Sequence, residues 1–351
     1  MIWRGVIEEY RKRLPIDPEL KAITLLEGNT PLIEAGRLAT RIEFDGRLYL
    51  KCEGLNPTGS FKDRGMTVAI SAAAHNGVET VICASTGNTS ASAAAYAASA
   101  GMRAFVIIPE GRIALGKLSQ AVVHGAKVVS IAGGFDEALQ IVAEIANQSD
   151  VVVVNSINPY RLQGQKTAAF EICDALGGAP THHFLPVGNA GNITAYWMGY
   201  REYRDTGVTD SAPRMMGFQA EGAAPIVSGK VVSKPKTVAS AIRIGNPVGW
   251  RSAEAARDES GGVIGAVTDR EILDSYRLLA TTVGTFAEPA SAASIAGLRR
   301  LVVEGRIERG AVVVCTLTGH GLKDPATATE ESPPAIKARA DVDEVRRVLD
   351  I

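Results

Sequence analysis

Short apolar runs alternate with longer stretches of helical periodicity along most of this chain of 351 residues. The runs that predict β-strands are Leu48–Glu53, Thr80–Ser85, Ala104–Pro109, Lys127–Ile131, Val151–Ser156, His183–Val187, Arg214–Ala220 and Ala311–Thr318. Between most of them, apolar residues recur at helical spacing, as in Asn88–Ala100, Phe135–Gln148 and Asp269–Val283. Strands that alternate with helices in this way predict an α/β fold with mainly parallel sheets.

Three segments stand out from this alternation. Val151–Val154 is apolar at every position, which predicts a strand that is covered on both faces. The segment 227–249 contains Pro235 and Pro247 and is expected to form a loop with short elements. Residues 324–334 are rich in Ala, Thr, Glu and Pro, so we expect a mobile linker there, followed by a short helix over 341–349.

Composition and charge disfavour two classes of protein. The chain has 37 Lys and Arg against 38 Asp and Glu, which gives a net charge of -1, and only 5% of its residues are aromatic. A nucleic-acid-binding protein with a broad cationic face or a stacking platform is therefore not expected. No apolar run approaches the roughly 18 residues that a membrane span needs, and charges come too early for a signal peptide. We expect a cytoplasmic protein without a membrane partner.

The cysteine and histidine residues show no metal-binding pattern. Cys52, Cys83 and Cys315 lie in apolar runs and are expected to be buried free thiols. His182 and His183 are neighbours on a predicted strand and point to opposite faces, so they cannot hold one ion together. We therefore expect no metal site.

Lys62 lies in the turn-rich segment Asn56–Gly65, where a helix is predicted to begin near Phe61. The helix macrodipole is positive at this end and disfavours an ammonium group. Burial would lower the pKa of the lysine further. A neutral amine is the form that a Schiff-base nucleophile requires, so Lys62 is the candidate catalytic residue.

Three loops that follow predicted strands are candidates for binding anions or ligands. Ser85–Ser92 brings five hydroxyl groups to the start of an Ala-rich helix, which suits a carboxylate. Val187–Asn192 has small residues that let backbone N–H groups approach a phosphate. Thr316–Gly321 ends a strand at the edge where ligands bind parallel sheets, and it includes His320, a weaker candidate for a general base.

A fourth segment, Gly111–Leu118, differs from a nucleotide-binding P-loop by one residue. A P-loop places Ser or Thr directly after its lysine, whereas this chain has Leu118 after Lys117. Ser119 comes one position late, which on a helix turns its side chain by about 100°. Nucleotide hydrolysis is therefore disfavoured, although Lys117 can still face a phosphate.

Taken together and in this order, the motifs resemble the fold-type II family of pyridoxal phosphate enzymes, and among them the threonine synthases most closely. The resemblance covers roughly residues 25–322. The segments that carry it are Glu27–Leu32, Asn56–Gly65, Ser85–Ser90, Leu115–Leu118, Val187–Asn192 and Phe286–Ser294.

The resemblance implies a set of cofactor contacts. Lys62 would bind pyridoxal 5'-phosphate covalently, Asn88 would hydrogen-bond its phenolic oxygen, and Thr318 would face its pyridine nitrogen. The neutral hydroxyl of Thr318 would leave that nitrogen unprotonated. The cofactor's phosphate would lie on Gly188, Asn189, Ala190, Gly191 and Asn192.

The resemblance also implies a reaction, the last step of threonine biosynthesis, in which O-phospho-L-homoserine and water give L-threonine and phosphate. Lys62 would remove the Cα proton and then a Cβ proton, phosphate would leave from Cγ, and water would add at Cβ. The candidates for binding the substrate carboxylate are Ser85, Thr86 and Thr89. The candidates for binding the substrate phosphate are Lys117, Asn155 and Arg161.

The chain is longer than the ~250–300 residues at which one core stops growing, so two lobes are expected. The resemblance implies two open, mainly parallel-sheet lobes, as in the tryptophan synthase β subunit, with the cofactor in the cleft between them. Residues 1–53 and 154–323 would form the larger lobe, 54–153 the smaller lobe, and 324–351 a linker and short helix. A homodimer is implied in the same way.

Three other functions stay open at this point. A threonine or serine dehydratase would use the same cofactor but needs no second phosphate site, so Lys117 and Arg161 discriminate. A P-loop nucleotide-binding protein is disfavoured by Leu118. A non-catalytic amino-acid sensor on the same scaffold is disfavoured by the presence of Lys62.

Overall fold

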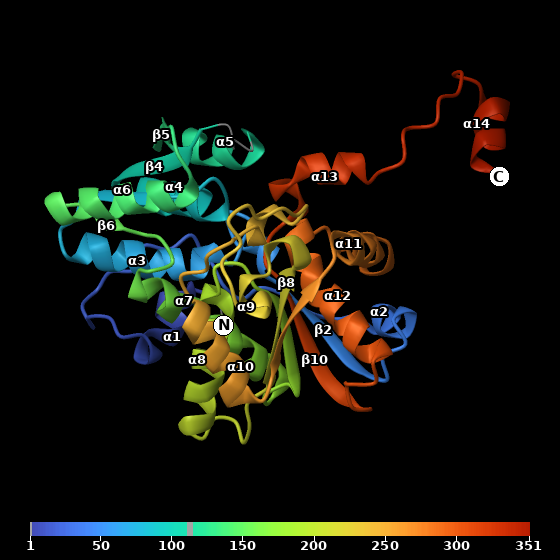
Figure 1. The fold of residues 1–351 in the computed structure, drawn as a ribbon, viewed down its shortest axis with the longest axis horizontal. Helices are drawn as coiled ribbons and strands as arrows, with labels where there is room; N and C mark the ends of the chain where they lie inside the picture. The colour runs from blue at the N-terminus through green and yellow to red at the C-terminus, as the bar shows by residue number, and fades with distance from the viewer. Residues whose placement is uncertain (1, 111–114) are drawn as a thin grey trace.

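The computed structural model describes residues 2–110 and 115–351 and contains two β-sheets (Figure 1). The larger sheet has six strands in the order β1-β2-β10-β7-β8-β9, and the smaller has four in the order β5-β4-β3-β6. Every pairing is parallel except that of β1 with β2. The predicted α/β fold with mainly parallel sheets is confirmed.

The strands of the larger sheet are β1 (Leu32–Glu34), β2 (Gly46–Cys52), β7 (His182–Pro186), β8 (Arg214–Ala220), β9 (Val263–Val267) and β10 (Ala311–Leu317). Those of the smaller sheet are β3 (Thr80–Ala84), β4 (Arg103–Pro109), β5 (Lys127–Ile131) and β6 (Val152–Val153). All four strands of the smaller sheet therefore lie between residues 80 and 153.

Helices cover both faces of the larger sheet, as Figure 1 shows. One face packs on α2 (Gly36–Arg41), α11 (Asp269–Val283) and α12 (Pro289–Val303). The other face packs on α7 (Pro159–Leu176), α8 (Gly191–Asp205) and α10 (Trp250–Ser260). Two separate apolar cores result, as expected for a parallel sheet buried on both sides.

The smaller sheet is also covered on both faces. Its first core includes residues of α3 (Lys62–His75), α4 (Asn88–Ser99) and α5 (Leu115–Val123). Its second core is formed by α6 (Phe135–Gln148). The remaining helices are α1 (Val6–Tyr10), α9 (Pro225–Ser228), α13 (Pro325–Glu330) and α14 (Val342–Leu349). Single 3-10 turns are formed by Arg11–Arg13, Glu53–Leu55, Glu221–Ala223, Ser240–Ile242 and Gly321–Lys323.

The helices α3 and α7 pack closely because glycine lies at their crossing. A Cβ on Gly65 would lie 2.5 Å from the carbonyl oxygen of Arg161, and a Cβ on Gly164 would overlap the carbonyl oxygen of Arg64. No other residue fits these two positions without moving one helix. The start of α3 is therefore fixed against α7.

Some predicted elements are wrong in detail. Val151–Val154 was expected to be covered on both faces, but only Val154 in it is fully buried, because β6 is a two-residue strand at the edge of the smaller sheet. The linker expected at 324–334 begins with the helix α13, which its N-cap Asp324 stabilises by accepting a hydrogen bond from the Thr327 N–H. The strands β1 and β9 were not predicted.

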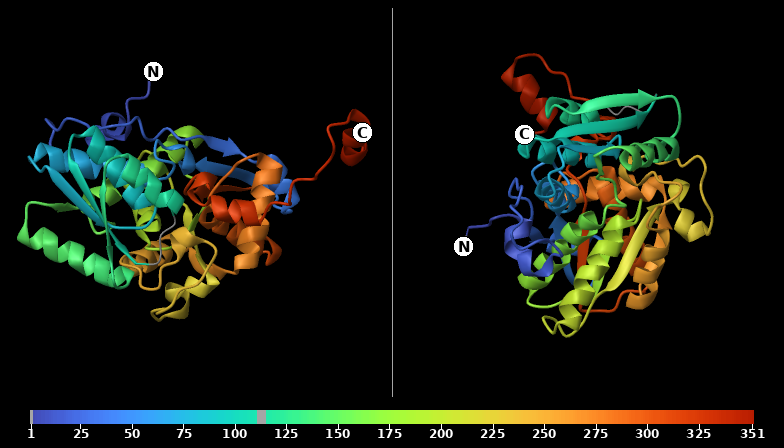
Figure 2. Two further views of the ribbon diagram at one scale, coloured as in Figure 1. Left: turned by 90° about the horizontal axis from the view of Figure 1, so that it is seen from above. Right: turned by 90° about the vertical axis from the view of Figure 1, so that its left-hand side faces the viewer.

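Other details agree with the prediction. The strands β5 and β8 and the helices α6 and α11 have the predicted bounds. Cys52, Cys83 and Cys315 are buried free thiols, as expected, and so is Cys173. The expected short helix near the C-terminus is α14, which stands away from both sheets (Figures 1 and 2).

Candidate active site

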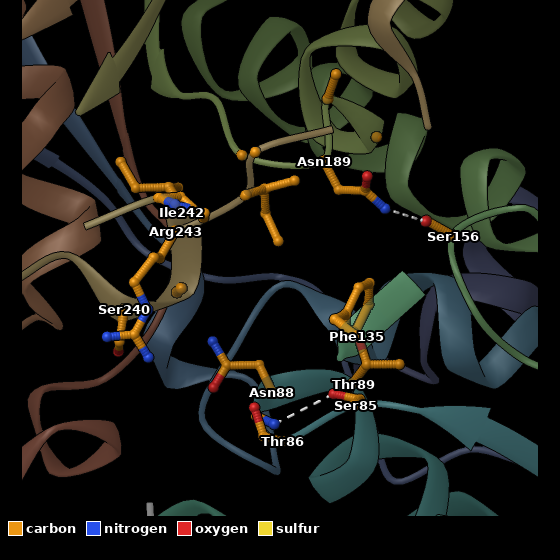
Figure 3. Close-up of a pocket in the computed structure, with 18 of the residues that line it drawn as sticks. Ser85, Thr86, Asn88, Thr89, Phe135, Ser156, Asn189, Ser240, Ile242 and Arg243 are labelled. Atoms are coloured by element: carbon orange, nitrogen blue, oxygen red, sulfur yellow. Dashed lines mark hydrogen bonds between the residues drawn. The ribbon is translucent and has the colours of Figure 1, made fainter. Parts of the chain in front are cut away.

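A pocket of about 970 Å³ lies where strands of both sheets end (Figure 3). Ala84 at the end of β3 and Pro109 at the end of β4 line it from the smaller sheet. Pro186 at the end of β7 and Thr318 after β10 line it from the larger sheet. The carboxyl ends of parallel strands are where ligands bind in this fold class. The pocket therefore joins the two halves of the molecule at their ligand-binding edges.

Lys62 lines this pocket from the first residue of α3. Its Nζ lies 4.3 Å from the centroid of the Phe61 ring. Burial and then the positive charge of Arg161 lower the pKa of the Lys62 amine to about 7, while the charge of Glu288 acts in the opposite direction. A substantial fraction of the amine is therefore neutral near pH 7, as a nucleophile or base requires.

Asn88 and Thr318 face a carboxylate that the sequence analysis did not assign. Glu288 is 1% exposed and lines the pocket. Its carboxylate accepts hydrogen bonds from Asn88 Nδ2, at 3.2 and 3.1 Å, and from Thr318 Oγ1, at 3.1 Å. The only sequence signal was its place in the segment Phe286–Ser294, where an acidic residue before a proline is more simply explained as a helix cap.

The loop between β7 and α8 forms a backbone cradle on the pocket wall. Ala190 has a φ of 66°, in the left-handed region, and it turns the chain into α8. The structure as described shows no loop or cap hydrogen bond donated by the backbone N–H groups of Gly188, Asn189, Ala190, Gly191 or Asn192. Free N–H groups at the start of a helix suit a phosphate.

A side chain of this cradle also links it to neighbouring loops. Asn189 donates from Nδ2 to Ser156 Oγ at 2.5 Å, as drawn in Figure 3, and its Oδ1 accepts from the Val248 N–H at 2.7 Å. Gly188 packs so tightly that a Cβ there would lie 2.9 Å from Ile242 Cα. The cradle is therefore held from three sides.

The hydroxyl groups after β3 gather on the opposite wall (Figure 3). Ser85 Oγ accepts from the N–H groups of Gly87, at 3.2 Å, and Ser90, at 3.3 Å, so it caps the start of α4. Thr86 and Thr89 line the pocket beside it. The structure brings all three predicted carboxylate-binding residues to one end of the pocket.

The three residues predicted to bind the substrate phosphate differ in their placement. Asn155 lines the pocket, with its amide paired to the backbone of Ala84 at 2.9 and 2.8 Å. Arg161 is 0% exposed and lies near Lys62 without lining the pocket, and Nη1 donates to the Val154 carbonyl at 2.6 Å. Among the described residues, its Nε and Nη2 have no partner. The side chain of Lys117 and residues 111–114 lie outside what the structure describes.

Two cations that line the pocket were missed by the sequence analysis. Lys236 and Arg243 come from the segment after α9, and both are exposed. Within residues 2–110 and 115–351, the structure gives neither side chain an ion pair. Their segment was correctly expected to be a loop with short elements, but nothing in its composition indicated that it would reach the pocket.

Comparison with known proteins decides the family. The model of the family described as "Pyridoxal-phosphate dependent enzyme" matches residues 23–319. The threonine synthase of Synechocystis sp. is 59% identical over 336 residues, which cover 96% of this chain and 87% of that protein. The Mycobacterium tuberculosis threonine synthase is 57% identical over 332 residues, with 94% and 92% covered. The Methanocaldococcus jannaschii threonine synthase is 50% identical over 357 residues, with 99% and 87% covered.

The chain belongs to the threonine synthase family of pyridoxal-phosphate dependent enzymes.

Solved structures agree on the fold of this family member. The crystal structure of O-ureido-L-serine synthase has a TM-score of 0.76 at 21% identity, with 92% of this chain and 99% of that chain covered. Maize serine racemase has a TM-score of 0.74 at 19% identity, with 94% and 97% covered. At such identities the likeness establishes the fold-type II architecture alone.

The pocket fits the family's cofactor on its own chemistry. Pyridoxal phosphate needs an amine that can be neutral, a site for a phosphate dianion and polar partners for its ring. Lys62 supplies the amine, the cradle 188–192 supplies free N–H groups, and Asn88 and Thr318 supply polar side chains. Asn88 Oδ1 is also buried without a partner among the described residues. These residues therefore fit the cofactor.

The described residues can also be searched for metal-binding clusters and membrane-spanning helices. Within them, no group of three or more His, Cys, Asp or Glu side chains could hold a metal ion. In the same part of the chain, no helix is long and apolar enough to cross a membrane.

Proposed function

We propose that the protein is a carbon–oxygen lyase that converts O-phospho-L-homoserine and water to L-threonine and phosphate. The observation that carries the proposal is the 50–59% identity to threonine synthases over nearly the whole chain. The pocket supports it, because one wall offers hydroxyl donors, the other offers a phosphate cradle, and Lys62 lines the same pocket.

Lys62 is the proposed proton carrier. The bound cofactor supplies an electron sink that makes the substrate's Cα–H and Cβ–H bonds acidic. Lys62 Nζ would take the proton from Cα and pass it on before taking a second proton from Cβ. After phosphate leaves from Cγ, one proton would be returned to Cγ and one to Cα, while water adds its OH at Cβ and its remaining proton goes to the phosphate. A pKa of about 7 suits both directions of transfer near neutral pH.

Ser85, Thr86 and Thr89 are proposed to bind the substrate carboxylate. Their hydroxyl groups lie at the start of α4, where the helix dipole also favours an anion. The hydroxyl hydrogen of Ser85 remains available for donation, because its oxygen is the atom that accepts from Gly87 and Ser90.

Arg161 is proposed to bind the substrate phosphate, with Asn155 and Lys117 as the other candidates predicted from the sequence. The two unpartnered nitrogen atoms of its buried guanidinium support the assignment, because a buried cation without a counter-ion is costly. A planar guanidinium also matches a phosphate in two-pronged geometry. Arg243 and Lys236 are the second candidates, because they line the pocket that Lys62 also lines.

The cofactor contacts are proposed on the same basis. Asn88 holds the phenolic oxygen, Thr318 faces the ring nitrogen, and the backbone of 188–192 holds the phosphate.

We also infer that the chain forms two lobes. The larger consists of residues 1–53 and 154–323 and the smaller of residues 54–153, and the two separate sheets support this division. The homodimer rests on resemblance alone, and sedimentation equilibrium of the purified protein tests it.

Product analysis tests the proposed function. The holoenzyme is incubated with O-phospho-L-homoserine, and threonine, phosphate and 2-oxobutyrate are measured by chromatography. We expect threonine and phosphate in equal amounts and no product from the Lys62→Ala variant. If separate incubations with threonine and serine give 2-oxobutyrate and pyruvate faster than phosphohomoserine gives threonine, the protein is a dehydratase instead.

A further inference from the structure

Glu288 is a buried carboxylate in the pocket for which the proposed mechanism has no role. It directly precedes α12, yet its side chain does not cap that helix. Instead the side chain packs against Gly319, in space that is open because residue 319 has no side chain. A Cβ there would lie 2.6 Å from both Cδ and Oε1 of Glu288. The carboxylate is therefore turned into the pocket and held there by the shape of the loop after β10.

The carboxylate joins the two halves of the molecule. Asn88 begins α4, which covers the smaller sheet, whereas Thr318 follows β10 of the larger sheet. Both donate to Glu288, and Ser291 Oγ lies 3.2 Å from Thr318 Oγ1. The Thr318 hydroxyl has one hydrogen, so while it donates to Glu288 it can offer a ring nitrogen only its oxygen. An amide Nδ2 carries two hydrogens, so Glu288 can hold one while the other remains for a ligand.

The carboxylate also completes the charges around Lys62. The charged side chains that act on the Lys62 amine are Arg161 from α7 and Glu288 before α12. Arg161 and burial both disfavour the ammonium, and Glu288 alone favours it. Without Glu288, the amine would be left with the buried cation Arg161 as its one charged neighbour among the residues that the structure describes.

We propose that Glu288 is a positioning residue of the cofactor site, which fixes the Asn88 amide and the Thr318 hydroxyl from opposite halves of the pocket and places a negative charge opposite Lys62. The proposal rests on the proposed function for the roles of Asn88 and Thr318. A purely structural role would instead stabilise the fold without affecting Lys62 or the cofactor.

The variant Glu288→Gln separates these two roles. It keeps the size of the side chain but removes its charge and turns one acceptor into a donor. The matched control is Glu27→Gln, because Glu27 is also fully buried and accepts from Val6 N–H and Tyr96 Oη, but does not line the pocket. Thermal unfolding of both variants measures the structural contribution.

The first readout uses the protein without cofactor. The rate at which trinitrobenzenesulfonate modifies Lys62 is followed against pH by mass spectrometry of the Lys62 peptide. The midpoint of this pH profile reports the pKa of Lys62, which is about 7 in the parent protein. Because a carboxylate stabilises the ammonium, loss of the Glu288 carboxylate should shift this midpoint downwards by about one unit or more in Glu288→Gln. The midpoint should stay in place in Glu27→Gln.

The second readout is the affinity for pyridoxal phosphate, measured by titration of the cofactor-free protein. Loss of hydrogen bonds to a charged group should weaken binding roughly ten- to hundredfold in Glu288→Gln. An unchanged midpoint together with unchanged affinity would overturn the proposal and leave Glu288 a structural residue.

A shorter carboxylate keeps the test valid if Glu288→Gln fails to fold. Glu288→Asp retains the charge but shortens the side chain, so we expect a midpoint near that of the parent protein and weaker cofactor binding. Cofactor binding equal to that of the parent protein would contradict the positioning role. Neither readout uses phosphohomoserine, so failure of the proposed reaction and failure of this inference are distinguishable.

Discussion

Among single residues, the two that matter most for the chemistry of the pocket are Lys62 and Arg161, because burial lowers the pKa of both. Lys62 and Arg161 are close enough that the charge of Arg161 lowers the pKa of the Lys62 amine. In turn, burial lowers the pKa of Arg161 to about 10. A dianion bound between them would relieve this repulsion, so the proposed phosphate site would favour a phosphorylated substrate over one without a phosphate.

The variant Arg161→Ala tests which cation binds the substrate phosphate. Loss of one partner of a desolvated charge pair costs about 3–5 kcal/mol, which is roughly a 10²- to 10⁴-fold fall in kcat/KM for O-phosphohomoserine. Deamination of serine, which has no phosphate, should fall much less. Arg243→Ala is the exposed control, and a larger selective loss in that variant would move the phosphate site to the loop after α9.

At the scale of elements, the position of Lys62 depends on a buried ion network behind α3. Arg64, two residues after Lys62, donates to Glu53 at 2.7 Å and to Glu171 of α7 at 2.6 Å. Lys51 of β2 donates to the same Glu171 at 2.7 Å. The two glutamates that pair with Arg64 belong to elements outside the smaller sheet, so the network fixes the start of α3 to the larger half of the molecule.

The variant Glu171→Gln should be destabilised by about 3–5 kcal/mol at pH 7, because it removes the carboxylate that pairs with buried Lys51 and one of the two that pair with buried Arg64. Burial raises the pKa of Glu171, but the charges of Arg64 and Lys51 outweigh it and lower the pKa to about 2. Because its pKa is lowered, ionised Glu171 stabilises the folded protein at pH values above the usual pKa of about 4.5. This stabilisation is lost as the pH falls towards about 2.

Urea unfolding at pH 7 and pH 3 measures this contribution. The difference between the parent protein and Glu171→Gln should shrink at the lower pH. Glu34→Gln is the control, because Glu34 pairs with Arg47 at the surface and should change stability by under ~1 kcal/mol. Equal effects of the two substitutions would show that the buried network does not stabilise the protein.

The elements that the sequence predicted well are those whose pattern is local. Short segments rich in apolar residues predicted β5 and β8, and helical periodicity predicted α6 and α11, with the observed bounds. The strand β1 has only three residues, so it has no strong local pattern, whereas β9 was missed although its segment is no less apolar than that of β8. The length of β6 depends on its place at the sheet edge, which only the tertiary fold determines.

The same distinction holds for the site. Lys62, the hydroxyls of 85–89 and the cradle 188–192 were found because each lies in a recognisable turn at the start of a helix. Glu288, Lys236 and Arg243 reach the pocket from a helix start and a loop whose local sequences have simpler explanations. Their proximity to Lys62 arises only when distant segments fold together.

At the scale of the whole molecule, the two sheets and their helices form the part that holds the pocket, and the C-terminal segment lies apart from it (Figure 2). Val342 and Leu349 of α14 are 68% and 58% exposed. In contrast, α13 is held to the body, since Glu331 after it pairs with Arg277 of α11. The boundary of the folded unit therefore falls after α13.

A chain that ends at Ser332 should keep the melting temperature within about 2 °C and the full activity of the parent protein, because residues 333–351 bury little apolar surface. Differential scanning calorimetry and the threonine assay measure both. A chain that ends at Lys323 is the control and should be less stable, because it also loses α13. A marked loss of activity in the first truncation would show that α14 contributes to the working enzyme.

The proposed reaction requires that phosphate leaves by cleavage of a carbon–oxygen bond and that water then adds to carbon. Turnover of O-phospho-L-homoserine in water enriched in oxygen-18, with mass spectrometry of both products, measures where the oxygen of water goes. We expect oxygen-18 in the β-hydroxyl group of threonine and none in the released phosphate. Oxygen-18 in the phosphate, accompanied by homoserine, would show hydrolysis at phosphorus and would rule out the proposed reaction.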